Sequence, residues 1–235
     1  MNELLSKRLR RVAYYIHDDI KVIADIGSDH AYLPCYVCLQ NPDLFAIAGE
    51  VNEGPYLAAK KQVEKYELEN QIDVRLGDGL SVLDKGEADC ITIAGMGGTL
   101  IAKILADGKD KLPHVKRLVL QPNIDAHAIR EFAVEEKYEI IAEEIIDDEG
   151  YIYEILVLEP TINMVNYSEK EMYLGPHLIE NKNEVFYEKW QHVLNKKYKI
   201  IDQMKNAQNI NYEKIDYFSK QVQWIEEEIE NDNNS

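Results

Sequence analysis

The feature that most constrains the fold is an alternation of short apolar runs with helical segments between residues 21 and 160. Runs of strand length occupy 21–26, 45–51, 72–76, 88–95 and 115–121, and helical patterns begin at Tyr32, Pro55 and Asp125. Runs that are apolar on both faces are typical of parallel strands covered by helices. Residues 139–146 and 151–158 follow and predict an antiparallel hairpin. We therefore expect an α/β domain whose mostly parallel sheet ends in an antiparallel hairpin.

Helical periodicity also marks both ends of the chain. Residues 3–16 predict an amphipathic helix, with an apolar stripe formed by Leu4, Leu5, Leu9, Val12 and Ile16. Beyond Pro160, two stretches with apolar residues three or four apart flank the Asn-rich segment 205–211. They predict two long helices folded back as an antiparallel coiled coil. We expect an α/β domain over 1–160 and a helical coiled-coil domain over 161–235.

The length and the cysteine content restrict the class of protein. At 235 residues the chain can form one large and one smaller domain. No stretch approaches the roughly 20 apolar residues of a membrane helix, and the first residues lack the apolar run of a secretory signal. Cys35, Cys38 and Cys90 are too few for a disulfide framework, and Cys35-x-x-Cys38 lacks the second pair typical of a zinc site. We expect a cytoplasmic protein with no membrane association and no metal.

The segment ADIGSDHAYLP (24–34) follows the first expected strand and carries the strongest functional signal. Gly27 lets the backbone approach a ligand closely because it has no Cβ atom, and the carboxyl ends of parallel strands are where such sheets bind ligands. The G-x-G-x-x-G spacing that cradles a pyrophosphate is absent. The pattern favours a nucleoside cofactor without phosphate groups, such as S-adenosylmethionine, over NAD. An ordinary strand–turn–helix connection is the alternative.

Informative residues also end the next three expected strands. Glu50 ends the second, where a carboxylate can accept hydrogen bonds from ribose hydroxyls, and Asp78 follows the third, where it can bind an adenine amino group. The glycines of AGMGGT (94–99) let flat groups pack on the backbone after the fourth strand, or simply start a helix. This segment lacks the Asn/Asp-Pro-Pro-aromatic motif with which amino-group methyltransferases hold an exocyclic nitrogen. A ring nitrogen such as adenine N1 is therefore favoured as the methyl acceptor.

Together these motifs resemble those of the bacterial tRNA adenine-22 N1-methyltransferase family. The segments that carry the resemblance are DIGSDHAYLP (25–34), EVNEGP (50–55), RLGDGL (75–80), AGMGG (94–98), QPN (121–123) and YLGPHL (173–178). The resemblance covers nearly the whole chain. It implies a class I, Rossmann-like methyltransferase domain followed by a helical coiled-coil domain, which agrees with the periodicity.

The resemblance also implies a set of site residues and a mechanism. The implied cofactor-binding residues are Asp25, Gly27, Ser28, Asp29, His30, Tyr32, Leu33, Glu50, Val51, Asn52, Asp78, Gly79, Ala94, Gly95, Met96, Gly97 and Gly98. Catalysis would be a direct transfer with N1 placed about 3 Å from the methyl group. Because N1 lies on the pairing edge, the base must leave its stack. Asp29 is the candidate catalytic carboxylate that assists while the ring is cationic; capping a helix or holding the cofactor is its alternative role.

The net charge of −17 argues against a broad surface for nucleic acid, because RNA-binding proteins usually carry a basic footprint. Any RNA contact must therefore use local basic groups. Candidates are Lys7, Arg8, Arg10 and Arg11 in the first helix, and Lys182, Lys189 and Lys196 at seven-residue spacing. Asn123 is a further candidate for contact with a base. Solvated helix faces are the alternative reading of both basic groups.

Three functions stay open on the sequence alone. The first is a tRNA adenine N1-methyltransferase, whose partner is tRNA. The second is a methyltransferase for a small metabolite, which the acidic charge favours and the coiled-coil appendage disfavours. The third is a non-catalytic adaptor that binds S-adenosylmethionine, which the intact cofactor motifs disfavour. No feature of the sequence indicates a protein partner.

Overall fold

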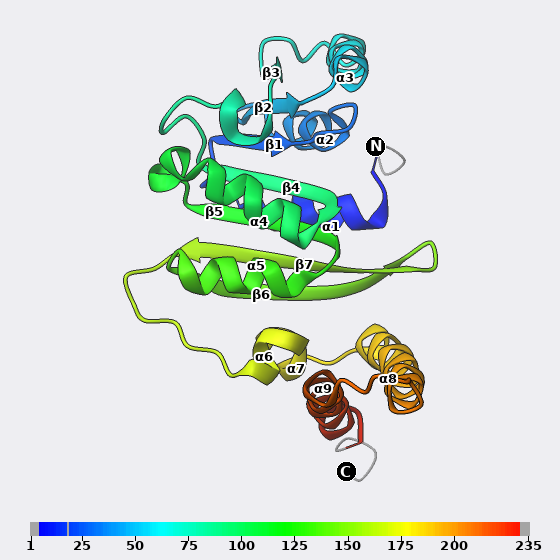
Figure 1. Ribbon diagram of the computed structural model, residues 1–235. Coiled ribbons are helices and arrows are strands. Elements are labelled where there is room, and N and C mark those ends of the chain that lie inside the picture. The colour runs from blue at the N-terminus through cyan, green and yellow to red at the C-terminus, as the bar shows by residue number, and fades with distance from the viewer. Residues whose placement is uncertain (1–4, 18, 231–235) are drawn as a thin grey trace. The chain divides into compact units, whose positions relative to one another are not determined.

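The computed structural model describes residues 5–17 and 19–230 of the chain. The chain divides into two compact units, Met1–Val165 and Asn166–Ser235. The first unit is a β-sheet with helices packed on it, and the second is entirely helical in its described elements (Figure 1). Among the described residues, no helix combines the length and the apolar character that crossing a bilayer requires.

A seven-stranded sheet with the order β3-β2-β1-β4-β5-β7-β6 forms the centre of the first unit. Its strands are β1 (Val22–Ile26), β2 (Phe45–Glu50), β3 (Ile72–Leu76), β4 (Cys90–Gly97), β5 (Arg117–Ile124), β6 (Tyr138–Asp148) and β7 (Tyr151–Pro160). The pairs from β3 to β5 are parallel, whereas β7 is antiparallel to both β5 and β6. The predicted mostly parallel sheet with a terminal hairpin is thereby confirmed. The strand order reverses between β1 and β4, which opens the crevice where α/β sheets bind ligands.

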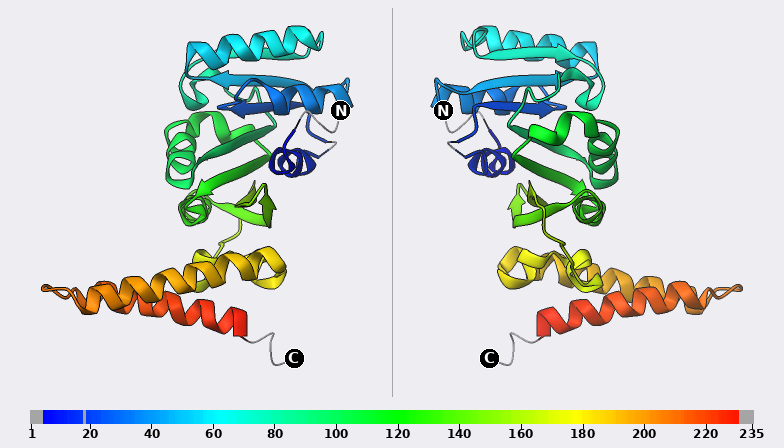
Figure 2. Two further views of the ribbon diagram at one scale, coloured as in Figure 1. Left: turned by 90° about the vertical axis from the view of Figure 1, so that its right-hand side faces the viewer. Right: turned by 90° about the vertical axis from the view of Figure 1, so that its left-hand side faces the viewer.

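Helices cover both faces of this sheet. On one face lie α1 (Lys7–Tyr14), α2 (Tyr32–Gln40) and α3 (Glu53–Lys65), and on the other α4 (Gly98–Asp107) and α5 (Ala126–Glu135) (Figure 2). Alternate strand residues feed the two cores. In β5, for example, Val119 packs in the cluster under α1–α3, while Leu118 and Leu120 are buried on the opposite face. Burial on both faces explains why these runs lack polar alternation in the sequence.

The first helix is shorter than the predicted 3–16. It begins after Ser6, whose side chain accepts a hydrogen bond from the Leu9 backbone N–H at 3.2 Å, which is the role of an N-cap residue. Val12 of the predicted apolar stripe is fully buried, and Leu5 is buried just before the helix. Leu4, the remaining member at that end, lies outside the described residues.

The β6–β7 hairpin turns at Glu149 and Gly150. Both residues have positive φ angles, +56° and +81°, as a two-residue type I′ turn requires. The glycine supplies one of these left-handed positions without steric strain. This turn chemistry, already present in the sequence as DDEG, fixes the register of the two longest strands.

The second unit contains α6 (Glu169–Leu174), α7 (Pro176–Glu180), α8 (Glu184–Lys205) and α9 (Tyr212–Glu230). The last two match the two long helices expected on either side of the Asn-rich segment, and they pack against each other. Coiled-coil geometry between them stays a prediction. The short helices α6 and α7 were not expected. They are separated by Gly175, whose φ of +101° ends α6, and by Pro176, which begins α7.

Candidate active site

The loop between β1 and α2 has an unusual backbone. Gly27 has a φ of +70°, and the three consecutive residues Asp29, His30 and Ala31 also lie in the left-handed region. This conformation is unfavourable by roughly 1–2 kcal/mol for a residue with a Cβ atom. Strain of this kind persists where surrounding contacts enforce it, and it concentrates at functional sites. The loop predicted from ADIGSDHAYLP therefore has a specific, strained backbone conformation that an ordinary strand–helix connection does not need.

Asp25 sits beneath this loop at the end of β1. Its carboxylate is buried and accepts hydrogen bonds from Ser28 Oγ and from Thr92 Oγ1, both at 2.6 Å. Burial raises the pKa of Asp25, while the two hydroxyl donors oppose that rise. With both oxygens engaged, Asp25 ties β1, β4 and the loop together. Asp25 therefore acts on the site indirectly, because its hydrogen bond with Ser28 holds the loop in place.

Glu50, at the end of β2, presents an unused acceptor. The residue is 5% exposed, and its Oε1 atom is buried with no hydrogen-bond partner among the described residues. The backbone N–H of Asp29 donates a hydrogen bond to this carboxylate. Burial raises the pKa of Glu50, and the nearby carboxylates of Asp25 and Asp29 add to the rise. A buried acceptor without a donor is unfavourable, so this oxygen fits the hydroxyl of a nucleoside ribose.

The other predicted residues of this edge are accessible to a ligand. The pairing of Glu50 with Leu76 places the ends of β2 and β3 side by side. Asp78 and Asn52 are exposed just beyond these strand ends, and Val51 is 57% exposed. Gly79 follows with a φ of +51°. The carboxylates of Glu50 and Asp78 therefore belong to neighbouring strand ends, as the sequence predicted.

The segment Ala94–Gly98 ends β4 and lies against the β1–α2 loop. The β4–β5 register shifts on both sides of Met96, so this part of β4 bulges at the sheet edge. A Cβ atom on Gly27 would lie 2.1 Å from Met96 Cε, which shows how tightly the two loops pack. A Cβ atom on Gly98 would lie 1.8 Å from the Asp125 carbonyl oxygen. Gly98 is therefore required by the close approach of the Asp125 backbone, whereas Gly27 is favoured by its positive φ angle, because the Met96 methyl group can move.

The peptide groups of Gly95 are held from both sides. Its N–H donates to Gln121 Oε1 at 3.0 Å, and its carbonyl accepts from Asn123 Nδ2 at 2.7 Å. Gln121 is fully buried, and its Nε2 donates to the Pro122 carbonyl. Asn123, predicted as a base contact, thus positions the loop through its amide nitrogen.

Asp29, His30 and Tyr32 carry a carboxylate and two rings where the β1–α2 loop meets α2. The Asp29 side chain is 83% exposed and lies 2.8 Å from His30 Nδ1. The His30 and Tyr32 rings are 5.6 Å apart between centroids. Leu33, in contrast, is buried in the core, and its packing there anchors the segment that follows the loop. An exposed carboxylate and two neighbouring rings therefore lie together where the β1–α2 loop meets α2.

The basic residues of α1 have different surroundings and do not form one patch. Arg11 forms an ion pair with Glu144 at 2.8 Å. Lys7 Nζ donates to the Asp147 carbonyl at 2.8 Å, and Arg10 donates to the Leu5 carbonyl at 2.6 Å. Arg8 Nη1 donates to Gln121 Oε1, beside the Ala94–Gly98 segment. The Arg8 guanidinium thus lies beside the Ala94–Gly98 segment.

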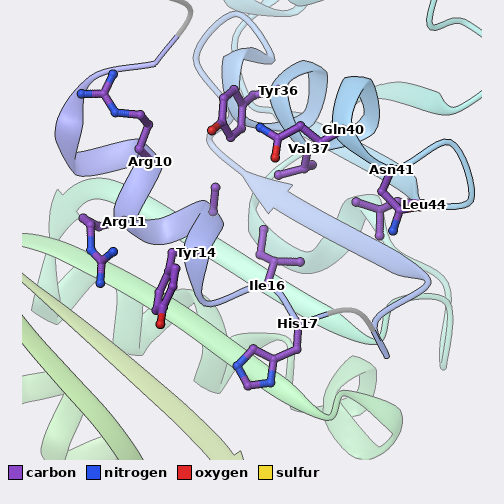
Figure 3. Close-up of a pocket in the computed structure, with 11 residues that line it drawn as sticks. Arg10, Arg11, Tyr14, Ile16, His17, Tyr36, Val37, Gln40, Asn41 and Leu44 are labelled. Carbon is purple, nitrogen blue, oxygen red and sulfur yellow. The ribbon is translucent and has the colours of Figure 1, made fainter. Parts of the chain in front are cut away.

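A cavity of about 540 Å³ lies between α1 and α2 (Figure 3). Its polar and aromatic lining comes from Arg10, Arg11, Tyr14, His17, Tyr36, Gln40 and Asn41. Figure 3 shows Arg10 pointing away from Arg11 and Tyr14, so the two guanidinium groups do not converge on one ligand position. The residues of the β-strand ends do not line this cavity.

The predicted lysines of the second unit are also unequal. Lys182 Nζ lies 2.9 Å from the Glu228 carboxylate and donates to the Glu228 carbonyl, which leaves it 12% exposed. Lys189 Nζ lies 4.4 Å from the centroid of the Trp190 ring. Lys196 is exposed on α8. Lys182 is therefore internally neutralised, and Lys196 faces solvent.

Sequence reasoning did not identify Thr92 or the role of Gln121. Both are polar residues inside otherwise apolar strands, CITIA and RLVLQ, and both are fully buried. A polar residue at a buried strand position needs a partner, so this interruption was the available signal. Across the described residues, no group of three or more potential ligands is arranged to hold a metal ion. Burial raises the pKa of the Cys35 and Cys38 thiols to about 12.

Comparison with known proteins gives matches along nearly the whole chain. The TrmK family model, tRNA (adenine(22)-N(1))-methyltransferase, matches residues 23–227. A Bacillus subtilis tRNA (adenine(22)-N(1))-methyltransferase is 48% identical over 98% of this chain and 99% of that protein. The crystal structure of the B. subtilis M1A22 tRNA methyltransferase TrmK has a TM-score of 0.90 and 47% identity, over 96% of this chain and 98% of that chain. A Streptococcus pneumoniae protein in complex with S-adenosyl-L-methionine has a TM-score of 0.85 and 37% identity, over 96% of this chain and 99% of that chain.

Proposed function

The chain belongs to the tRNA (adenine(22)-N(1))-methyltransferase family, and from that premise we propose how its own residues carry out the reaction. It is an S-adenosylmethionine-dependent enzyme that methylates N1 of adenine 22 in tRNA. When bound, S-adenosylmethionine supplies an electrophilic methyl group on a sulfonium. The observation that carries the proposal is the buried, unpartnered Oε1 atom of Glu50.

The cofactor site is the edge formed by the ends of β1, β2, β3 and β4. Glu50 accepts the ribose hydroxyls, which supply the donors that its Oε1 atom lacks. Asp78 accepts from the adenine amino group. The strained loop and the Ala94–Gly98 segment form the two walls. The remaining members of the site are Asp25, Gly27, Ser28, Asp29, His30, Tyr32, Leu33, Val51, Asn52 and Gly79, some acting by contact and Asp25 and Leu33 by supporting the loop.

Asp29 is the proposed catalytic residue. Methylation at N1 gives the adenine ring a positive charge, and a nearby carboxylate stabilises that charge. The exposed Asp29 side chain projects from the strained loop, and His30 at 2.8 Å limits its rotation. Most of the rate enhancement comes from placing N1 in line with the methyl group.

RNA contacts use local cations on an acidic body. We assign them to the basic residues of α1, to Asn123 through the loop that it positions, and to Lys182, Lys189 and Lys196, of which Lys196 is more exposed than Lys182. These contacts must hold the tRNA while adenine 22 leaves its stack. The enzyme has its substrates in the cytoplasm, where tRNA and S-adenosylmethionine are both present.

One experiment tests the activity and the role of Asp29 together. Purified protein is incubated with labelled S-adenosylmethionine and unmodified tRNA, and the RNA is digested to nucleosides. We expect label in 1-methyladenosine with the wild type, and none with a matched tRNA carrying guanosine at position 22. Asp29→Asn should lower kcat by about 10²-fold, which is a much larger effect than any rise in the cofactor dissociation constant. Label in any other nucleoside would overturn the proposed activity, and an unchanged kcat would remove Asp29 from catalysis.

A further inference from the structure

Arg8 is a cation whose charge is not neutralised within the described part of the protein. Its guanidinium contacts are all neutral: Nη1 donates to the Gln121 amide, and the Tyr153 ring centroid lies 5.2 Å from Cζ. No described carboxylate forms an ion pair with it. By comparison, Arg11, Arg75, Arg117 and Arg130 each have a carboxylate partner. In a chain of net charge −17, an unpaired guanidinium is therefore a distinctive feature.

This guanidinium is held in a fixed position. The backbone N–H of Arg8 donates to Asp148 Oδ2 at 2.9 Å, which fixes this end of α1 on the hairpin. Gln121 Oε1 accepts from both Arg8 and the Gly95 N–H, and Gln121 itself is fully buried. A side chain held in this way loses little conformational entropy when it binds a ligand.

The guanidinium also lies beside the segment that forms one wall of the proposed site. A Cβ atom on Gly95 would lie 3.3 Å from Arg8 Nη1, so the guanidinium rests directly against the bulge of β4. A nucleotide whose base enters along Ala94–Gly98 brings its flanking phosphates to the same place. Arginine is well suited to phosphate because its planar N–H groups can donate two parallel hydrogen bonds.

The adenine ring itself is an unfavourable partner for this cation. N1-methylation makes the ring positively charged, and a guanidinium over the ring would oppose that change. A phosphate group carries the opposite charge before, during and after methyl transfer. We propose that Arg8 binds a phosphate flanking the target adenosine and so holds the nucleotide in place outside its stack. The inference rests on the proposed function and names the RNA group that this part of the site binds.

A neutral phosphate analogue tests the pairing directly. Two tRNAs are assembled with one methylphosphonate, either 5′ or 3′ of adenosine 22, and compared with unmodified tRNA. For the wild type, we expect KM to rise about tenfold with one of the two, since a charge-assisted contact is lost. Arg8→Gln should raise KM for unmodified tRNA about tenfold, with kcat within about twofold, and should show no further loss with that same analogue.

The controls separate this role from a structural one. Lys61→Gln removes one exposed charge from α3 and should behave as wild type with every tRNA. Arg8→Lys should recover part of the loss, because it restores the charge without the paired donors. The proposal is overturned if the KM increases caused by Arg8→Gln and by the methylphosphonate multiply when the two changes are combined. It is also overturned if neither analogue raises KM for the wild type, or if Arg8→Gln weakens S-adenosylmethionine binding as strongly as tRNA binding. Failure of the proposed function is distinct, because the wild type would then form no 1-methyladenosine on unmodified tRNA.

Discussion

Glu50 is a residue that lowers the stability of the ligand-free protein and that we propose binds the cofactor. Its carboxylate is buried, one oxygen lacks a donor, and two other carboxylates are near enough to raise its pKa further. All three are unfavourable without a ligand, and hydroxyl donors compensate for them by supplying the hydrogen bond that the buried oxygen lacks. The ordinary pKa of 4.5 is therefore exceeded in the free protein.

Glu50→Gln should stabilise the ligand-free protein and weaken cofactor binding. A raised carboxyl pKa means that this group's contribution to stability is complete below pH 4.5 and is lost as the pH rises through the folded-state pKa. The variant should therefore unfold at a higher temperature than wild type at about pH 8, and the difference should shrink toward about pH 4.5. Affinity for S-adenosylmethionine, measured by calorimetry, should fall by about tenfold or more.

The exposed Glu64→Gln is the matched control on α3 and should leave both properties unchanged. A Glu50→Gln variant with unchanged cofactor affinity would contradict the assignment of the ribose contact.

At the scale of elements, α5 is joined to the hairpin by a buried charge cluster. Arg130 of α5 is 1% exposed and lies 2.7 Å from Glu143 of β6 and 2.6 Å from Glu154 of β7. Removing the cation leaves two carboxylates in a site that water does not reach. Removing one partner of a buried ion pair is more damaging than replacing the whole group by apolar side chains.

Arg130→Met should lower the free energy of unfolding by about 3–5 kcal/mol, measured by urea denaturation. The triple variant Arg130→Met, Glu143→Leu, Glu154→Leu should recover most of that loss. Arg75→Met breaks a more exposed pair with Glu87 and is the control, with an expected loss of about 1 kcal/mol or less. Equal losses of unfolding free energy for Arg130→Met and Arg75→Met would show that burial does not make the Arg130 ion pairs more important to stability.

Elements were more predictable from sequence than their mutual contacts. The strands of the parallel sheet and the hairpin were predictable because apolar periodicity and turn residues are local signals. The pairing of strand ends then followed from parallel topology, which brings the strand ends beside Glu50 and Asp78 together. The contacts of Arg8 with Gln121 and of Arg11 with Glu144 join residues more than a hundred positions apart, and no local pattern encodes them. For the same reason, the basic residues of α1 could not be recognised as unequal.

At the scale of the whole molecule, the proposed cofactor site and the α8 lysines lie in different units. The complete sheet, both of its cores and every residue of the proposed cofactor site belong to Met1–Val165. The lysines of α8 belong to Asn166–Ser235. The acidic net charge means that tRNA must be attracted by few cations, so losing those of one unit should be severe.

A fragment of residues 1–165 should fold and bind S-adenosylmethionine within about threefold of the full chain, because its core is complete without the second unit. Its KM for tRNA should rise by about 10²-fold, in line with the salt-dependent affinity that lysine contacts give. Calorimetry and the nucleoside assay measure the two quantities. In the full chain, Lys189→Glu with Lys196→Glu should reproduce part of the tRNA effect. A fragment with undiminished tRNA affinity would remove α8 from the RNA surface.

The attachment of α1 has a consequence for how the enzyme comes into being. Lys7, Arg8 and Arg11 are anchored to Asp147, Asp148 and Glu144, which the ribosome adds more than 130 residues later. Until those residues emerge, α1 lacks its contacts with the hairpin, and the guanidinium beside Gly95 is not fixed in place. A growing chain therefore cannot hold a tRNA nucleotide at this edge before its first unit is nearly finished, and premature capture of substrate by an incomplete enzyme is avoided by the order of synthesis alone.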